Sequence, residues 1–122
     1  MILADTSVWI DHFRSGSKGL QKLLDQRQIV IHPFVIAELA LGSLRHRSAT
    51  LALLDFLPQI RLAQMNEVRL AIEAHGLHGL GIGLIDAHLI ASVLIDRSTS
   101  LWTGDKQLRR VAQVLGIHAG LA

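Results

Sequence analysis

The 122-residue chain contains no cysteine, and this absence excludes several kinds of chemistry. Disulfide bonds, thiolate nucleophiles and cysteine-based zinc sites all require a thiol, so none of them is available to this protein. A chain without cysteine also fits the reducing environment of the cytoplasm. We therefore expect a cytoplasmic protein whose reactive groups are carboxylates, histidines or hydroxyls.

The sequence also lacks an uninterrupted apolar run long enough to cross a membrane. Its longest apolar stretch, residues 76–95, is broken by Asp86, by glycines and by two histidines, which argues against a membrane-spanning helix. The N-terminus has no basic segment, and Asp5 interrupts its short apolar run, so we expect no signal peptide.

Charged residues are few, at 18% of the chain, whereas apolar residues make up 50%. This composition argues against disorder and predicts a hydrophobic core. The length fits one domain, and we predict that residues 1–122 form it. So much apolar surface is difficult to bury in so small a domain, so we also expect a homo-oligomer.

Three apolar stretches each contain a single acidic residue. Asp5 is the only charged residue of MILADTSVWI, Glu38 of PFVIAELALGSL, and Asp86 of GLHGLGIGLIDAHLIASVLI. A carboxylate carried into apolar surroundings without a basic partner is costly, so it either takes up a proton or meets a cation. Three such acids suggest that the fold gathers them around a metal.

Short apolar runs alternate with helical patterns along the chain. Runs at residues 2–4, 29–31 and 100–102 predict buried strands, and residues 60–62 and 117–118 are candidates for two more. The expected helices are residues 8–13 (capped by Thr6 or Ser7), 19–26, 33 to about 42, 48–56, 66–75, 84–95 and 106–115. This alternation predicts an α/β fold, a three-layer α/β/α sandwich with a mainly parallel central sheet.

Ligands bind such sheets beyond the carboxyl ends of the strands. Asp5 directly follows the first predicted strand, and a fourth acid, Asp105, follows the strand at residues 100–102. Glu38 lies about one turn into the helix after the second strand, and Asp86 lies in the first turn of its helix. We therefore expect all four acids at one edge of the sheet.

Four carboxylates without cysteine make a hard, oxygen-rich site that suits Mg²⁺ or Mn²⁺. Two such ions would balance the four charges and could serve the attacking water and the leaving oxygen of a phosphodiester. Each acid also has a purely structural interpretation as a helix cap or surface residue. That interpretation is the better one for Asp105 taken alone, equal in weight for Asp86 and poor for Glu38.

The charge balance agrees with a nuclease, although many small domains are mildly basic. Without the four candidate acids, 10 − 4 = 6 acidic residues stand against 12 basic ones, of which 9 are arginines. A basic surface around an acidic pocket suits a phosphodiester substrate. Two arginine pairs, Arg45 with Arg47 and Arg109 with Arg110, are candidates for phosphate contact or for solvated helix faces.

At this point four segments resemble the acidic motifs of PIN-domain ribonucleases: ILADTSVWIDHF, HPFVIAELALG, GLIDAHLIASVL and LWTGDKQL. They occur in the family's order and at its separations, and together they span essentially the whole chain. The similarity is greatest to the VapC toxins of bacterial type II toxin–antitoxin pairs.

The resemblance implies roles for particular residues. Asp5, Glu38 and Asp86 would be catalytic acids that bind the metal, and Asp105 would complete the acidic pocket with the least certain role. Thr6 and Thr103 resemble the hydroxyl residues that flank the family's motifs. Their hydroxyls would hydrogen-bond the carboxylates or a metal-bound water.

The resemblance further implies an endoribonuclease that hydrolyses RNA phosphodiester bonds with Mg²⁺ or Mn²⁺. It also implies a homodimer and inhibition by a cognate antitoxin. An arginine or lysine of the antitoxin that entered the acidic pocket would displace the metal, since closely spaced carboxylates attract any cation.

Other classes of protein compete with this interpretation. In a receiver domain Asp55 of LLDFLP would accept phosphate beside Lys106, but receivers need paired acids after the first strand. In a haloacid-dehalogenase-type hydrolase Asp5 would be a nucleophile assisted by Thr103 and Lys106, and Glu38 would have no task. A catalytically silent domain that only binds RNA or a partner would not need all four acids.

The remaining aromatic and imidazole side chains give weaker signals. His75, His78 and His88 lack the HExxH spacing of a zinc site, so we expect loop or surface positions for them. Trp9 and Trp102 flank the predicted site, and core packing explains both better than base stacking does.

Overall fold

A sheet of short parallel strands forms the centre of the computed structural model, which describes residues 1–121. Its strands, in the spatial order β2-β1-β3, are β1 (Ile2–Ala4), β2 (Ile29–Val30) and β3 (Ser100–Trp102). Leu3 of the central strand aligns with Val30 on one side and with Leu101 on the other. Because the strands are parallel, their carboxyl ends meet at one edge. Ala122, the last residue of the predicted domain, lies outside the described residues.

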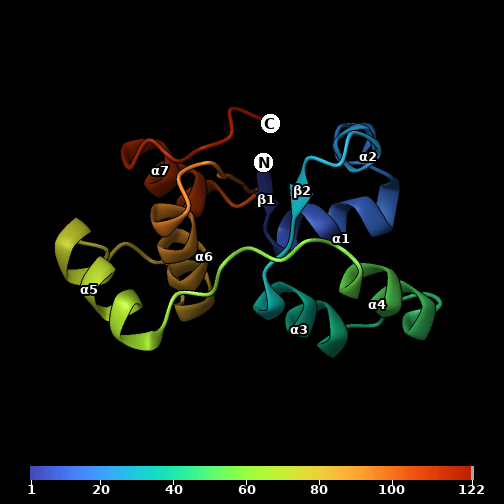
Figure 1. Cartoon of the computed structure of the whole chain (residues 1–122), viewed down its shortest axis with the longest axis horizontal. Helices are drawn as coiled ribbons and strands as arrows, with labels where there is room; N and C mark the ends of the chain where they lie inside the picture. The colour runs from blue at the N-terminus through green and yellow to red at the C-terminus, as the bar shows by residue number, and fades with distance from the viewer. Residues whose placement is uncertain (122) are drawn as a thin grey trace.

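Helices cover both faces of this sheet. They are α1 (Thr6–Ser15), α2 (Lys18–Asp25), α3 (Pro33–Leu41), α4 (Arg47–Asp55), α5 (Met65–His75), α6 (Leu84–Ile95) and α7 (Lys106–Val114). In Figure 1, α1, α2 and α4 lie to the right of β1 and β2, α3 lies below them, and α5 to α7 lie to their left. The predicted three-layer α/β/α sandwich with a parallel sheet is confirmed.

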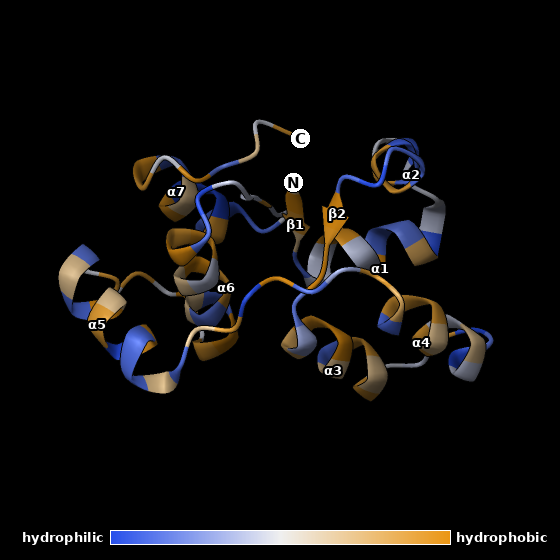
Figure 2. Cartoon of the chain, viewed as in Figure 1, coloured by the Kyte–Doolittle hydropathy of each residue, from blue (hydrophilic) through white to orange (hydrophobic). Residues whose placement is uncertain are grey.

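The core lies where the strands meet α6. The strands read as continuous apolar runs because both of their faces are covered, and β1 and β2 are drawn in orange in Figure 2. Seven successive residues of α6, from Ala87 to Val93, are buried. A helix that is buried nearly all round needs apolar residues on every side, which explains the composition of residues 84–95. Its Ser92 hydroxyl accepts a hydrogen bond from the Ala63 amide at 3.3 Å.

The start of α3 is set by local chemistry. His32 is its N-cap, and the imidazole Nδ1 accepts a hydrogen bond from the Phe34 amide at 2.9 Å. Pro33 occupies the first helical turn, where its missing N–H costs nothing. The predicted opening of this helix at His32 and Pro33 is therefore confirmed, and it fixes the direction in which Glu38 leaves the sheet.

Two of the predicted short strands do not form as predicted. Residues 60–62 carry no strand, and one parallel bridge joins the preceding Gln59 to Ile31. At the other end of the chain His118 makes a single parallel bridge to Leu101. Apolar residues suit a strand locally, but a ladder also needs a partner of matching length.

The predicted cap of α1 is also wrong. We expected Thr6 or Ser7, but both lie inside the helix and Asp5 is the N-cap. An aspartate is as good a cap as serine or threonine, and here it lies immediately after the strand. This places the first candidate catalytic acid in a structural role as well.

Within residues 1–121, no helix is both long enough and apolar enough to cross a membrane.

Candidate acidic active site

Asp5 lies at the junction between β1 and α1 and is almost completely buried, with 5% of its surface exposed. Its Oδ1 accepts hydrogen bonds from the Ser7 hydroxyl at 2.5 Å and from the Val8 amide at 3.1 Å. Its Oδ2 accepts a third from the Thr103 hydroxyl. Burial raises the pKa of the Asp5 carboxyl, while the hydrogen bonds from Ser7, Thr103 and Val8 act in the opposite direction.

Thr103 joins the ends of the two neighbouring strands, since it follows β3 directly and is fully buried. Its hydroxyl donates to Asp5 and accepts a hydrogen bond from the Asp105 amide at 2.9 Å. A second link runs from the Gly104 amide to the Ser7 hydroxyl at 2.9 Å. A side chain at Gly104 would approach Ser7 Oγ to 3.3 Å, so this contact favours glycine.

Glu38 projects from the middle of α3 toward the start of α1. The Thr6 hydroxyl donates a hydrogen bond of 2.6 Å to its Oε1. The Glu38 side chain is partly buried, consistent with its apolar neighbours in the sequence. Because one carboxylate oxygen is held by Thr6, the other is left for a ligand.

Asp86 lies in the first turn of α6 and is partly buried. Burial raises the pKa of its carboxyl first of all, and the neighbouring charges of Asp5, Asp105 and Glu38 raise it further. A carboxylate feels such repulsion only when the other charges are close by. The four candidate acids therefore share one electrostatic neighbourhood.

Asp105 is the N-cap of α7, and its Oδ1 accepts a hydrogen bond from the Leu108 amide at 2.9 Å. Its side chain is exposed. The structural interpretation of Asp105 as a helix cap therefore holds, although the residue also contributes negative charge to Asp5 and Asp86.

As they stand, the acids do not enclose a finished metal site. Among residues 1–121, no three aspartate, glutamate or histidine side chains are grouped closely enough to hold an ion. Asp5 also uses three of its roughly four lone-pair positions on hydrogen bonds within the protein. The hydroxyls expected to bond the carboxylates do so, since Thr6 donates to Glu38 and Thr103 donates to Asp5.

Ser7 is the site residue that sequence reasoning missed. The sequence suggested it only as a possible cap of the first helix. The structure gives it a supporting role instead, as a donor to Asp5 and an acceptor from Gly104. The available signal was its spacing: a hydroxyl two residues after a strand-ending aspartate lies within reach of that carboxylate.

Two histidines pack together beside the sheet, away from any carboxylate hydrogen bond. The rings of His32 and His88 lie 6.4 Å apart, and Phe34 contacts both edge-on. Burial, together with the nearby His88, lowers the pKa of His32 to about 4. His88 is buried, contrary to the expected surface or loop position, whereas His75 and His78 are exposed as expected.

In each of the two arginine pairs, one arginine bonds to the backbone of the described residues and the other does not. The Arg47 guanidinium donates to the Ala40 carbonyl, and the Arg109 guanidinium donates to the Thr103 carbonyl. These two arginines therefore support the fold near the site. Arg45 and Arg110 are exposed and stay available for phosphate.

The rival phosphoacceptor does not occupy a strand end. Asp55 is the exposed last residue of α4, whereas a receiver domain needs its phosphoacceptor at the carboxyl end of a strand. Trp9 and Trp102 are both buried, so core packing explains them as expected.

Comparison with known proteins agrees with the nuclease interpretation. The family described as the PIN domain matches residues 2–114. Two relatives named Ribonuclease VapC32, from the CDC 1551 / Oshkosh and H37Rv strains of Mycobacterium tuberculosis, are each 41% identical to this chain over 117 residues. The aligned region covers 96% of this chain and 94% of each relative.

Proposed function

The chain belongs to the PIN-domain family, and we propose that it is a VapC-type toxin that hydrolyses RNA with Mg²⁺ or Mn²⁺ at its acidic edge. The observation that carries this proposal is the environment of Asp86. Burial raises the pKa of its carboxyl first of all, and the charges of three other carboxylates, on Asp5, Asp105 and Glu38, raise it further. A fold that holds four acids this close favours the binding of a cation, because a cation relieves their repulsion.

The donor chemistry fits a hard divalent ion. Asp5, Glu38 and Asp86 would hold it, with Asp105 adding charge from the rim, and all four supply only oxygen ligands. Such an ion activates a water molecule and stabilises the charge that develops on a phosphodiester. Because no three of these side chains enclose an ion within the described residues, we expect Glu38 and Asp86 to adjust when the ion binds.

The protein's own residues prepare this edge. The hydroxyls of Ser7 and Thr103 fix the carboxylate plane of Asp5, and the Thr6 hydroxyl fixes one oxygen of Glu38. Side chains that are held before the ligand arrives lose little entropy on binding. These three hydroxyls therefore act as positioning residues for the two acids.

We expect the enzyme to act as a homodimer in the cytoplasm. Large apolar side chains on α3, on α4 and at the C-cap of α4 support a protein partner, since Leu41, Leu53 and Phe56 are 89%, 69% and 88% exposed. The resemblance to VapC toxins supports a cognate antitoxin as a second partner. A cation on that antitoxin would compete with the metal for the acidic edge.

The proposal is tested by incubating the purified protein with end-labelled single-stranded RNA. We expect internal cleavage with Mg²⁺ or Mn²⁺, and none with EDTA or in the Asp5→Asn variant. The matched control is Asp25→Asn, which alters an exposed acid on α2 and should cleave like the wild type. Cleavage that survives both EDTA and Asp5→Asn would contradict the proposal.

The toxin role is tested separately in cells. We expect growth arrest on expression of the wild-type chain, relief by co-expression of the small gene next to it, and normal growth with Asp5→Asn. Harmless expression of a protein that cleaves RNA in vitro would refute the toxin role and leave the nuclease intact.

A further inference from the structure

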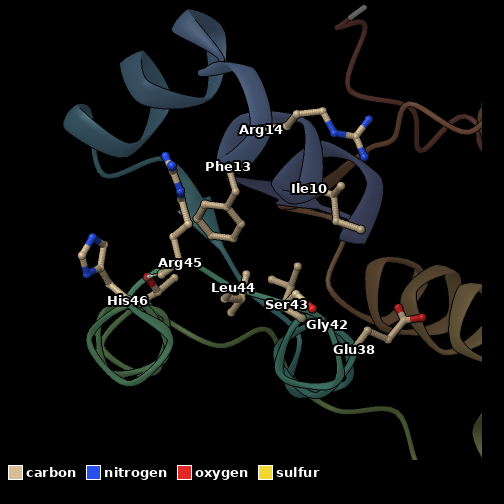
Figure 3. A pocket seen from close by; sticks show the side chains of 11 residues that line it. Ile10, Phe13, Arg14, Glu38, Gly42, Ser43, Leu44, Arg45 and His46 are labelled. Atoms are coloured by element: carbon tan, nitrogen blue, oxygen red, sulfur yellow. Dashed lines mark hydrogen bonds between the residues drawn. The ribbon is translucent and has the colours of Figure 1, made fainter.

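A pocket of about 630 Å³ lies directly beside the acidic edge. It is bordered by α1, by the end of α3 and by the segment that leads into α4. Its size is within the range of small-molecule and single-nucleotide sites. Figure 3 shows Phe13 and Arg45 toward one end of this pocket and Glu38 toward the other. The pocket therefore opens from a candidate catalytic acid onto a different set of side chains.

The charge of the pocket is opposite to that of the acidic edge. Its lining includes Arg14, Arg45 and His46, and Glu38 is the one acid among the lining residues. No hydrogen bond or ion pair within residues 1–121 engages the guanidinium of Arg14 or Arg45. Both are exposed, so they are free to bind an anion such as a phosphate.

The backbone at the entrance of α4 is also unusual. His46 has φ 47° and ψ 49°, which is the left-handed region, and it is one of two non-glycine residues with positive φ in the described chain. Residues other than glycine adopt this conformation in only a few per cent of cases, histidine more often than most, and such residues gather at ligand sites. This geometry turns the chain between Arg45 and α4 at the border of the pocket.

An aromatic side chain supplies the apolar part of the pocket. Phe13 is 37% exposed, and its ring is held against Trp9 and His12 with centroid separations of 5.8 Å and 5.9 Å. A ring fixed in this way can stack on a nucleic-acid base without losing much freedom. Stacking on an aromatic side chain accepts every base, because each base has a π-face.

We propose that this pocket binds one nucleotide of single-stranded RNA next to the scissile phosphate, with its base on Phe13 and its phosphate on Arg45. The inference rests on the proposed RNA hydrolysis, since Glu38 links the two sites. Single-stranded RNA fits better than a duplex, whose bases are already stacked and paired. It also fits better than a peptide without acidic groups, because two arginines, Arg14 and Arg45, line the pocket beside a single carboxylate.

The proposal is tested by fluorescence anisotropy with a labelled eight-nucleotide single-stranded RNA in EDTA, where the proposed cleavage is silent. Phe13→Leu keeps apolar volume but removes the ring, and we expect about tenfold weaker binding. Phe13→Tyr restores a ring and should bind within about twofold of the wild type. The Phe13 variants should leave the salt dependence of binding unchanged, since stacking displaces no counterions.

Arg45→Gln should weaken binding about fivefold and lower the slope of log affinity against log salt by about 0.7, the value for one phosphate contact on a single strand. The matched control is Arg97→Gln. Arg97 is an exposed arginine before β3, at the opposite edge of the sheet from the acids, and its replacement should change neither quantity.

A second readout separates this inference from the proposed function. Hydrolysis of bis(p-nitrophenyl) phosphate needs the acidic edge but is too small to need the pocket, so Phe13→Leu and Arg45→Gln should retain it. If the wild type hydrolyses neither RNA nor this ester, the proposed function fails, and the anisotropy experiment still decides the pocket. Unchanged RNA affinity in both variants overturns the inference, and if antitoxin binding is weakened instead, the pocket belongs to a protein partner.

Discussion

The junctions β1–α1 and β3–α7 have the same local design but different surroundings. In each, an aspartate follows a strand, caps the next helix and accepts a hydrogen bond from the amide three residues later. Asp5 is buried on the central strand and receives two hydroxyl hydrogen bonds as well. Asp105 follows an edge strand, is exposed, and accepts only the capping bond among the bonds recorded in residues 1–121.

This difference separates the acid that we propose as a metal ligand, Asp5, from Asp105, whose hydrogen bonding is that of a helix cap. Local sequence sets the cap, because any aspartate before a helix can accept from the first turn. Burial and additional donors set the environment of the carboxylate: burial raises the cost of its charge, and the hydroxyl donors fix its orientation and offset part of that cost. The position of the strand within the sheet, and not the motif itself, assigns the two roles.

Neutralising each aspartate in turn tests most sharply whether Asp5 and Asp105 differ in role. Asparagine caps helices as well as aspartate does, so both helices should persist in Asp5→Asn and Asp105→Asn. We expect Asp5→Asn to lower RNA cleavage about 10³-fold and Asp105→Asn about tenfold or less. Initial rates on one RNA substrate, with circular dichroism to check folding, measure both. Equal losses in the two variants would mean that burial does not separate their roles.

A smaller effect is expected from Thr103→Val, which removes the hydroxyl that joins the two junctions while keeping the shape of the side chain. A buried oxygen of Asp5 and the Asp105 amide each lose a partner, so the free energy of unfolding should fall by about 1–3 kcal/mol. RNA cleavage should fall about tenfold as Asp5 loses its orientation.

The matched control is Thr99→Val, which alters a buried threonine just before β3, at the other end of the strand. It should lower stability without lowering the cleavage rate of the folded protein. Urea denaturation and initial rates give the two quantities. A comparable loss of activity in both variants would assign Thr103 a purely structural role.

Much of the fold was predictable because its signals are local. The strands 2–4 and 100–102 and the buried helix 84–95 are apolar runs with clear limits, and all three form with those bounds. The failed strand at 60–62 depended on pairing with a distant segment, which propensity does not report. The Asp5 cap was missed because three consecutive residues, Asp5 to Ser7, are all good capping residues.

The candidate site was predictable only in part. Strand ends and motif order identified the acids that raise the pKa of Asp86. The Thr103 hydroxyl, 98 residues away from Asp5 in the sequence, was expected only through the family resemblance, and its bond to Asp5 confirms that expectation. The Ser7 donor was not expected. The pocket beside Glu38 likewise combines α1 with the segment before α4, and its members share no pattern in the sequence.

The smallest expected effect concerns the stability of the metal-free protein. The pKa of Asp86 is raised in the fold from its ordinary value of 3.8, so the folded state binds more protons than the unfolded state above that pH. The stabilisation that comes from protonated Asp86 is therefore fully present below pH 3.8. It is lost as the pH rises through the higher pKa of this residue in the folded state.

Asp86→Asn removes this penalty. At pH 7 in EDTA the variant should be more stable than the wild type by about 0.5–2 kcal/mol, and the advantage should disappear near pH 4. Saturating Mg²⁺ should stabilise the wild type more than the variant. Thermal denaturation at both pH values measures this. A variant that is less stable than the wild type at pH 7 would show that Asp86 is not strained by its neighbours.

The central claim is that the buried acid after β1, together with its neighbours, forms one cation site. Isothermal titration calorimetry of the purified protein with Mn²⁺ tests it most directly. We predict that Asp5→Asn weakens Mn²⁺ binding at least about tenfold, the loss of one charged ligand, whereas Asp25→Asn binds like the wild type. Equal Mn²⁺ affinity in Asp5→Asn and the wild type would contradict the account.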